Sequence, residues 1–311
     1  MTEASALVRA VLPLVMAAML GCGPTGHVPT TDPTVERQLR AELSAKHLAI
    51  WDSSCHEREY DSFRLIGFDG SDSGWVGPPG LGVGAPVGTA EQGRRVLVEQ
   101  RNGDIVAVAK DGAITNRLHA ACGRHVAVAQ DLRHIACPGM GCKGRTPSCF
   151  SLLSSKSIAS AEEIATHLRG PELIESVSWS PDASRLVYSK EGRIYLYSFG
   201  LDQSTLLTEG TGVSWSPDGA WIAFIHDGNI DLISPQGGPV RTLIENATQA
   251  EPVKWSPDSA YALASYYSAH FTAGLQELGR VEVIRISDGA ELTLIYPDAT
   301  GILCMEWIKT E

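Results

Sequence analysis

The sequence predicts an all-β fold, a β-propeller of about six four-stranded blades, with seven blades as the alternative. Three observations support this prediction. One segment recurs at intervals of about 40 residues, several short apolar stretches follow within each interval, and turn-forming residues separate these stretches. Four short strands in such a period are typical of a propeller blade.

The recurring segment consists of a tryptophan followed by Ser, Pro and Asp. Three copies are present, and their tryptophans lie 36 and 40 residues apart. Proline presets φ and the aspartate side chain can accept a hydrogen bond from the backbone two residues on, so the segment predicts a tight turn after the innermost strand. The tryptophan is expected to pack between blades. The motif residues, all interpreted as structural, are Trp179, Pro181, Asp182, Trp215, Pro217, Asp218, Trp255, Pro257 and Asp258.

Each motif is followed by further apolar stretches that predict the other strands. The clearest blades span about residues 172–210, 211–249 and 250–300. Upstream, residues 126–137 are a degenerate copy, residues 95–108 match the middle of a blade, and residues 61–68 predict a further strand. Residues 160–168 fit either a capped helix or a fourth strand. Residues 303–308 resemble an innermost strand ending in the repeat's tryptophan, which predicts ring closure by pairing with N-terminal strands.

These repeats resemble those of TolB-type and prolyl-peptidase-type propellers, which are related to WD repeats. The clear match covers about residues 172–262, and a weaker one covers most of residues 90–310. The resemblance implies a fold rather than one function, because such propellers serve as docking platforms, enzyme covers and sensors. The TolB family has an additional N-terminal α/β domain, for which the stretch between Cys22 and the first blade is too short.

The N-terminal region predicts export and a lipid anchor. Residues 1–21 have the layout of a secretory signal, and Gly21-Cys22 completes a lipobox that would leave Cys22 lipidated. Ordinary secretion and an uncleaved anchor are the alternatives. Residues 22–35 predict a flexible Pro/Thr/Gly tether, residues 36–50 a short helix, and residues 51–311 the propeller. The expected location is the cell envelope, periplasm-facing or on the cell surface, with inner and outer membrane both open.

Charge and cysteine content limit the partners and the chemistry. The formal net charge of −11 argues against a nucleic-acid partner, since an acidic surface repels phosphate. Of the seven cysteines, six remain beside Cys22, so up to three disulfides are predicted, with their pairing open. The disulfide candidates are Cys55, Cys122, Cys137, Cys142, Cys149 and Cys304.

No catalytic residue, metal site or cofactor is predicted. The nucleophile motif Gly-x-Ser-x-Gly is absent, and the His and Cys residues between 119 and 142 match no standard zinc spacing. The leading hypothesis is a non-enzymatic envelope lipoprotein that docks a protein or glycan partner. Long loops near residues 75–86 and 266–276 are candidate contacts, through Trp75, Tyr266, Tyr267 and Phe271. For each loop, coverage of a blade edge is the alternative.

Two further functions stay open. One is a propeller enzyme, a lyase or glycan hydrolase, with its site in the central channel; the other is a secretion or sensor accessory protein. Two or more carboxylates, or a His beside an Arg, at the channel mouth would favour the enzyme. A channel lined with small and apolar side chains would argue against it.

Overall fold

The fold is taken from a computed structural model of the chain. It describes residues 32–52, 63–69, 71–76, 83–100, 104–119, 127–137, 151–157, 160–164, 174–247, 250–272, 275–294 and 302–309. The predicted signal segment and Cys22 therefore lie outside the described residues. So do Cys55, Cys122, Cys142 and Cys149.

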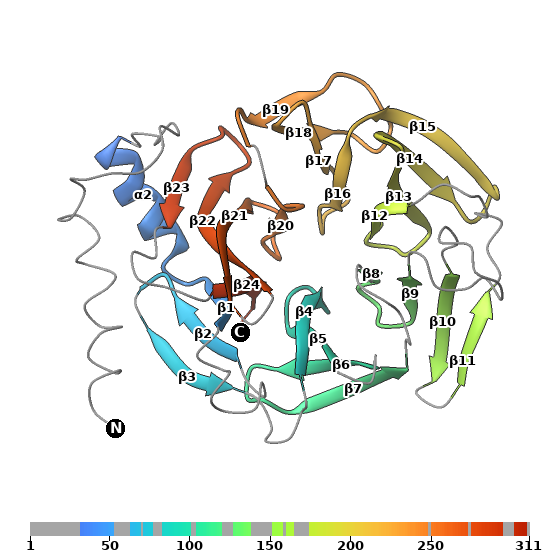
Figure 1. Ribbon diagram of the computed structural model, residues 1–311, viewed down its shortest axis with the longest axis horizontal. Helices are drawn as coiled ribbons and strands as arrows, with labels where there is room; N and C mark the ends of the chain where they lie inside the picture. Colours follow the sequence, from blue (N-terminus) through green and yellow to red (C-terminus); the bar gives the residue numbers. More distant parts are fainter. Residues whose placement is uncertain are drawn as a thin grey trace.

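The described strands form six four-stranded sheets, each a blade, which stand in a ring in Figure 1. The predicted all-β propeller is confirmed. One blade combines both ends of the ring, in the order β24 (Ile302–Ile308), β1 (His47–Asp52), β2 (Phe63–Gly67) and β3 (Asp72–Val76). The next contains β4 (Val83–Ala90), β5 (Arg95–Gln100), β6 (Asp104–Ala109) and β7 (Ile114–His119). The third contains β8 (Ala127–Val128), β9 (His134–Cys137), β10 (Ser151–Ser157) and β11 (Ser160–Ile164).

The remaining three blades carry the three clear repeats. The first consists of β12 (Ile174–Trp179), β13 (Arg185–Lys190), β14 (Arg193–Ser198) and β15 (Gln203–Glu209). The second consists of β16 (Thr211–Trp215), β17 (Ile222–His226), β18 (Asn229–Ile233) and β19 (Arg241–Ile244). The third consists of β20 (Lys254–Trp255), β21 (Tyr261–Thr272), β22 (Leu275–Arg285) and β23 (Glu291–Leu294). All pairs are antiparallel, and the first strand of each blade lies innermost (Figure 1).

The ring closes through a strand from each end of the described chain. β24 pairs with β1 in the register Leu48↔Trp307 and Ile50↔Met305. This pairing is the ring closure that residues 303–308 predicted. A backbone hydrogen bond of 2.8 Å from Lys309 N to Gly93 O then ties this blade to the β4–β7 blade. We call the sheet β24-β1-β2-β3 the closing blade.

The helix predicted over residues 36–50 has different bounds, α2 (Pro33–Leu43). Asp32 caps its N-terminus by accepting a hydrogen bond of 2.7 Å from Thr34 N, and Pro33 suits the first helical position because it needs no N–H partner there. Ser44 ends the helix, and residues 47–50 pair as a strand instead. The tether predicted to reach residue 35 therefore overlaps the helix, and the propeller begins at His47.

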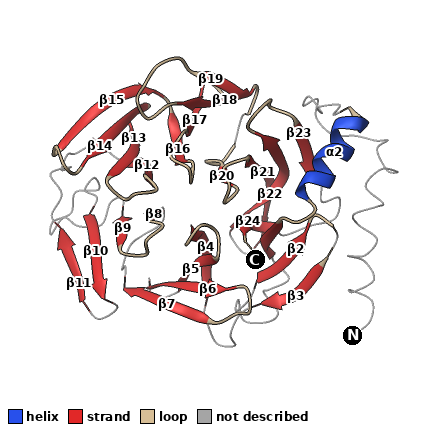
Figure 2. Ribbon diagram, turned by 180° about the vertical axis from the view of Figure 1, so that it is seen from behind, coloured by secondary structure: helices blue, strands red, loops and turns tan. Residues whose placement is uncertain are grey.

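The helix packs on the outside of the ring. Figure 2 shows α2 in blue beside β23. Leu39 and Leu43 are fully buried in a cluster that includes Tyr261, Leu263 and Trp307. The cluster joins the β20–β23 blade to the closing blade, so the helix covers the seam where the ring closes.

The described residues of both predicted loops lie in strands. Trp75 lies in β3, and Tyr266, Tyr267 and Phe271 lie in β21. β21 and β22 contain 12 and 11 residues, and their pairing continues to Thr272↔Leu275, which makes residues 261–285 a long hairpin. The loop prediction for residues 266–276 is therefore wrong for the described residues, where the aromatic residues Tyr266, Tyr267 and Phe271 suit a strand. Residues 160–164, left open between helix and strand, form β11.

The Ser-Pro-Asp turns share one hydrogen-bond network. In the turn after β16, Ser216 Oγ donates to Asp218 Oδ1 at 2.6 Å and accepts from Trp221 N at 2.9 Å. Asp218 Oδ1 also accepts from Ala220 N at 3.0 Å. The turns at Asp182 and Asp258 repeat these three bonds. Serine and aspartate thus satisfy backbone amides that the strands leave unpaired.

Candidate functional site

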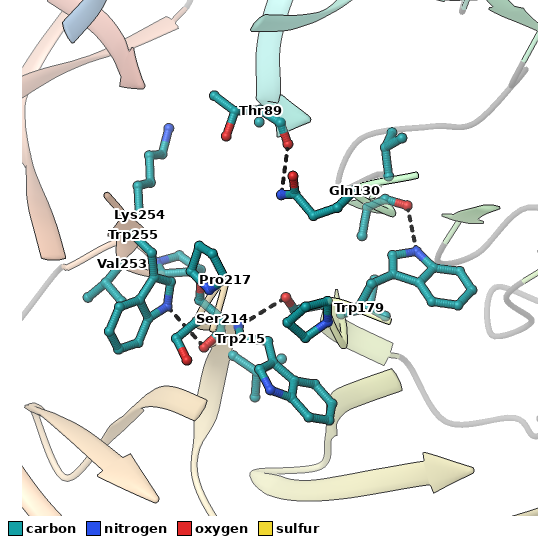
Figure 3. A pocket seen from close by; sticks show the side chains of 18 of the residues that line it. Thr89, Gln130, Trp179, Ser214, Trp215, Pro217, Val253, Lys254 and Trp255 are labelled. Carbon is teal, nitrogen blue, oxygen red and sulfur yellow. Dashed lines mark hydrogen bonds between the residues drawn. The ribbon is translucent and has the colours of Figure 1, made fainter. Parts of the chain in front are cut away.

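A cavity of about 240 Å³ lies among the innermost strands, at the centre of the ring (Figure 3). Its lining includes the three motif tryptophans Trp179, Trp215 and Trp255, and two of the motif prolines, Pro181 and Pro217. The tryptophans are nearly buried, so most of their ring surface lies in the contacts between blades. We call this space the channel cavity.

The tryptophan side chains fix the spacing of neighbouring innermost strands. The indole N–H of Trp179 donates to Ala127 O at 3.1 Å, and that of Trp255 donates to Ser214 O at 3.3 Å (Figure 3). Trp307 repeats the contact, with Lys254 O at 3.0 Å. In each case the acceptor is a backbone carbonyl of the preceding blade. It belongs to the residue before that blade's own tryptophan, or before the residue that takes the tryptophan's place.

Trp215 departs from this pattern. Its Nε1 is buried and has no hydrogen-bond partner among the described residues. Its backbone N–H donates instead to Ser178 Oγ at 3.0 Å, and the Arg185 guanidinium lies 5.1 Å from the centre of its ring. The cation over the ring face offsets part of the missing hydrogen bond.

The residue before each tryptophan, or before its counterpart in the degenerate blades, lines the channel cavity. Matching turn hydrogen bonds place Thr89 and Val128 as those counterparts. The six residues of this ring, which we call the channel ring, are Gly88, Ala127, Ser178, Ser214, Lys254 and Glu306. Four of the six are small, and the two charged ones lie on adjacent blades.

Lys254 and Glu306 form an ion pair, with 2.8 Å between Nζ and Oε1. The Glu306 side chain is 8% exposed and that of Lys254 is 20% exposed. Burying both charges costs desolvation energy that their attraction only partly returns. Sequence reasoning missed this pair, although the varying residue before the repeated tryptophan was a signal that could have revealed it.

A second cavity, of about 550 Å³, adjoins the channel cavity and shares Pro217 with it. It lies between the end of α2 and the turns that follow β16 and β20. Lys46 Nζ pairs with Asp258 across it, and Lys309 also lines it. Both cavities thus touch the face of the ring that carries the turns after the innermost strands, which we call the turn face.

The α2 end of this second cavity is held by a polar network. Glu42 accepts two hydrogen bonds of 2.8 Å from Arg285 Nη1 and one of 2.9 Å from the Tyr261 hydroxyl. The bonds from Arg285 lower the pKa of Glu42. Burial, together with the hydrogen bond to Glu42, raises the pKa of Tyr261 to about 12. Glu42 is therefore ionised and Tyr261 neutral at physiological pH.

Exposed aspartates recur on the turn face, because each repeat places one in the turn after its innermost strand. They are Asp131, Asp182, Asp218 and Asp258. The hydrogen bond from Ser180 lowers the pKa of Asp182. Burial acts to raise the pKa of Asp258, but the hydrogen bonds from Lys46 and Ser256 outweigh it and leave this pKa below its usual value.

Of the predicted contact residues, Tyr266 has a described side chain, and it belongs to the lining of neither cavity. Tyr266 is buried, and its hydroxyl donates to Glu282 Oε2 at 2.8 Å, which is an interior contact between strands of one blade. Tyr267 and Phe271 continue the same strand, and Trp75 is in β3. Of the disulfide candidates, Cys137 lies in β9 and Cys304 in β24, and the pairing of the six stays a prediction.

The lining limits the chemistry of the channel cavity. Among its described lining residues, Glu306 is the single carboxylate, and none is His or Arg. Across the part of the chain that the structure describes, no three His, Cys, Asp or Glu side chains gather in a way that could hold a metal ion. Nor does any described helix have the length and apolar character that a membrane crossing needs.

Comparison with known proteins identifies the fold. No protein-family model and no curated protein matches the chain. Among solved structures, TolB from Acinetobacter baumannii matches with a TM-score of 0.59 and 12% identity, over 85% of this chain and 67% of that one. A putative TolB from Agrobacterium tumefaciens matches with a TM-score of 0.54 and 17% identity, over 85% and 99%. A chain of a nidogen/laminin complex matches with a TM-score of 0.57 and 10% identity, over 86% and 99%. The chain therefore has a TolB-like β-propeller fold.

Proposed function

We propose that this chain is an envelope-anchored, non-enzymatic propeller that docks a protein partner on its turn face. The observation that carries the proposal is the pair of adjoining cavities on that face, bordered by exposed aspartates. Cavities beside repeated carboxylates offer both a recess for a side chain and charges that orient a partner.

The partner expected on this face is a protein with a basic contact surface. The formal net charge of −11 supports this, because it attracts basic surfaces and speeds their encounter. Asp182 and Asp218 contribute exposed carboxylates in neighbouring turns. The similarity to a chain from a nidogen/laminin complex also supports a protein partner, since that structure is by its name an assembly of proteins.

The envelope anchor rests on the sequence. Gly21-Cys22 follows an apolar run, and the first described residue, Asp32, comes ten positions after Cys22 and caps the helix at the outside of the ring. A lipidated Cys22 would therefore hold the propeller near a membrane by its rim. Mass spectrometry of the mature N-terminus tests this, with Cys22→Ser as the variant expected to leave the membrane fraction.

The docking face is tested by purification of the tagged full chain from its native cells after membrane extraction, with mass spectrometry of the proteins that accompany it. The test variant combines Asp182→Asn with Asp218→Asn, because asparagine keeps the Oδ1 acceptor that each turn uses. The control is Asp227→Asn, in the turn between β17 and β18 at the opposite end of the strands. A stoichiometric partner should be reduced in the test variant alone.

Equal recovery from the test and control variants would show that the partner does not use the turn face. A purification without any stoichiometric partner would count against protein docking altogether. It would favour the other hypotheses drawn from the sequence, a glycan-binding propeller or an enzyme.

A further inference from the structure

We propose that the channel cavity binds one organic cation, the ammonium or guanidinium end of a Lys or Arg side chain, and that Glu306 is the anion that receives it. This inference rests on the proposed docking function, since the side chain would belong to the partner. It adds the chemical identity of the group that enters the cavity.

The fold does not require a charged pair at the channel ring. The other four blades form with Gly, Ala or Ser at the same position. An ion pair that is largely removed from water is seldom more stabilising than small uncharged residues would be. Its presence on two adjacent blades therefore indicates a role in recognition.

The Glu306 carboxylate has one oxygen in the ion pair and one outside it. Glu306 Oε1 is occupied by Lys254, whereas none of the described residues donates a hydrogen bond to Oε2. Glu306 is 6% exposed and lines the cavity. A nearly buried carboxylate with one open oxygen binds a cation more strongly than an exposed one, because little water competes for it.

The volume of the channel cavity fits the end of a single side chain. Pockets that hold drug-sized ligands measure about 300–1,000 Å³. The channel cavity measures about 240 Å³, so it suits the end of one side chain better than a folded segment. The small residues Gly88, Ala127 and Ser214 leave the space that such a side chain needs.

The charge of the chain favours a cation over an anion as the ligand of the channel cavity. Lys254 gives the pair a positive end as well, so an anion is the competing ligand. The formal net charge of −11 and the exposed carboxylates of Asp182 and Asp218 on the turn face make the approach to the cavity more favourable for a cation. Lys254 stays on Oε1 and competes with the ligand cation for Glu306, because its ammonium group repels a second cation at the same carboxylate.

The test uses the full chain and two acetylated, amidated tripeptides, one with a central arginine and one with the neutral isostere citrulline. Binding is measured by titration calorimetry at low salt. The arginine peptide should bind at least about tenfold more tightly than the citrulline peptide, since one hydrogen bond to a charged group contributes at least this much.

Two variants should shift the affinity in opposite directions. Glu306→Gln removes the anion and should weaken binding of the arginine peptide about tenfold or more. Lys254→Met keeps the aliphatic stem but removes the competitor, and should strengthen binding. If Lys254 and Glu306 only tie two blades together, both variants lower the urea midpoint and neither changes the preference for arginine over citrulline; this result would overturn the inference.

A third variant guards against loss of folding. Lys254→Ser together with Glu306→Ser places at both positions the residue found at Ser178 and Ser214, so the ring should still form. It should bind both peptides equally weakly. A retained preference for arginine in this variant would refute the role of Glu306, as would tighter binding of an acetylated glutamate tripeptide to the unaltered chain.

The outcome is separable from that of the proposed function. Partner recovery that is undiminished by Glu306→Gln, with no preference for arginine, would reject the channel site while docking on the turn face stands. An arginine preference that depends on Glu306, without any co-purifying partner, would support the channel site and count against protein docking.

Discussion

Replacement of Leu39 by alanine should destabilise the whole ring, although Leu39 lies outside the propeller. Its side chain is fully buried in the cluster that joins α2 to the β20–β23 blade and the closing blade. Removing three carbons costs about 2.4 kcal/mol at roughly 0.8 kcal/mol for each buried group. A cavity adds to this, which gives about 3 kcal/mol within the known range of about 2–5 kcal/mol.

The assay is urea unfolding followed by tryptophan fluorescence, because Trp307 lies in the same cluster and reports on the seam. The control is Arg37→Ala, an exposed position on the same helix, which should cost less than about 0.5 kcal/mol. If Leu39→Ala shifts the midpoint no more than Arg37→Ala, the helix does not hold the seam. A separate early transition for α2 alone would refute the reasoning in the same way.

Three further predictions concern the repeats and the α2 network. Trp179→Phe retains an aromatic ring but loses the indole donor to the neighbouring blade, and should cost about 1–3 kcal/mol in urea unfolding because the Ala127 carbonyl loses its partner. Ser216→Ala should cost a similar amount, about 1–3 kcal/mol, since a turn amide loses its buried acceptor; an unchanged midpoint would contradict the turn network. The hydrogen bonds from Arg285 lower the pKa of Asp288 to about 2, so their contribution is present above the ordinary pKa of 3.8 and is lost as the pH falls toward 2. Wild type should therefore be more stable than Asp288→Asn at about pH 5, and this difference should shrink at about pH 3.

The propeller was predictable because its information is local and repeated. Trp215 and its two equivalents stand before turns that proline and aspartate specify, and each turn is followed by apolar strands of suitable length. Ring closure was predictable as well, since Trp307 ends a strand that has no blade of its own.

The sequence failed where long-range pairing decides the structure. Residues 266–276 were expected to form a loop, yet the described ones continue a hairpin whose register is set by the pairing of β21 with β22 along their length. His47 to Ile50 continue a helical pattern, but β24 and β2 flank them on both sides and hold them as a strand. Propensity alone contains no information about these partners.

The candidate site was harder still, because a channel exists only once all blades are placed. Glu306 and Lys254 are 52 positions apart in the sequence and meet because their blades are neighbours. The sequence does show that the residue before each tryptophan varies, although the rest of the repeat is regular. A comparison of the residues before each tryptophan, rather than of the tryptophans themselves, would have pointed to the pair.

The pairing of β1 with β24 also determines when the ring can close during folding. The two strands lie about 250 residues apart in the chain, so closing this contact carries a large loop-closure entropy and belongs late in folding. Until β24 arrives, the inner edge of β1 offers unpaired backbone groups to any other strand nearby. A ribosome or translocon that releases the chain gradually from its N-terminus would therefore leave the first blade exposed longest, which makes this edge the expected point of contact for a chaperone.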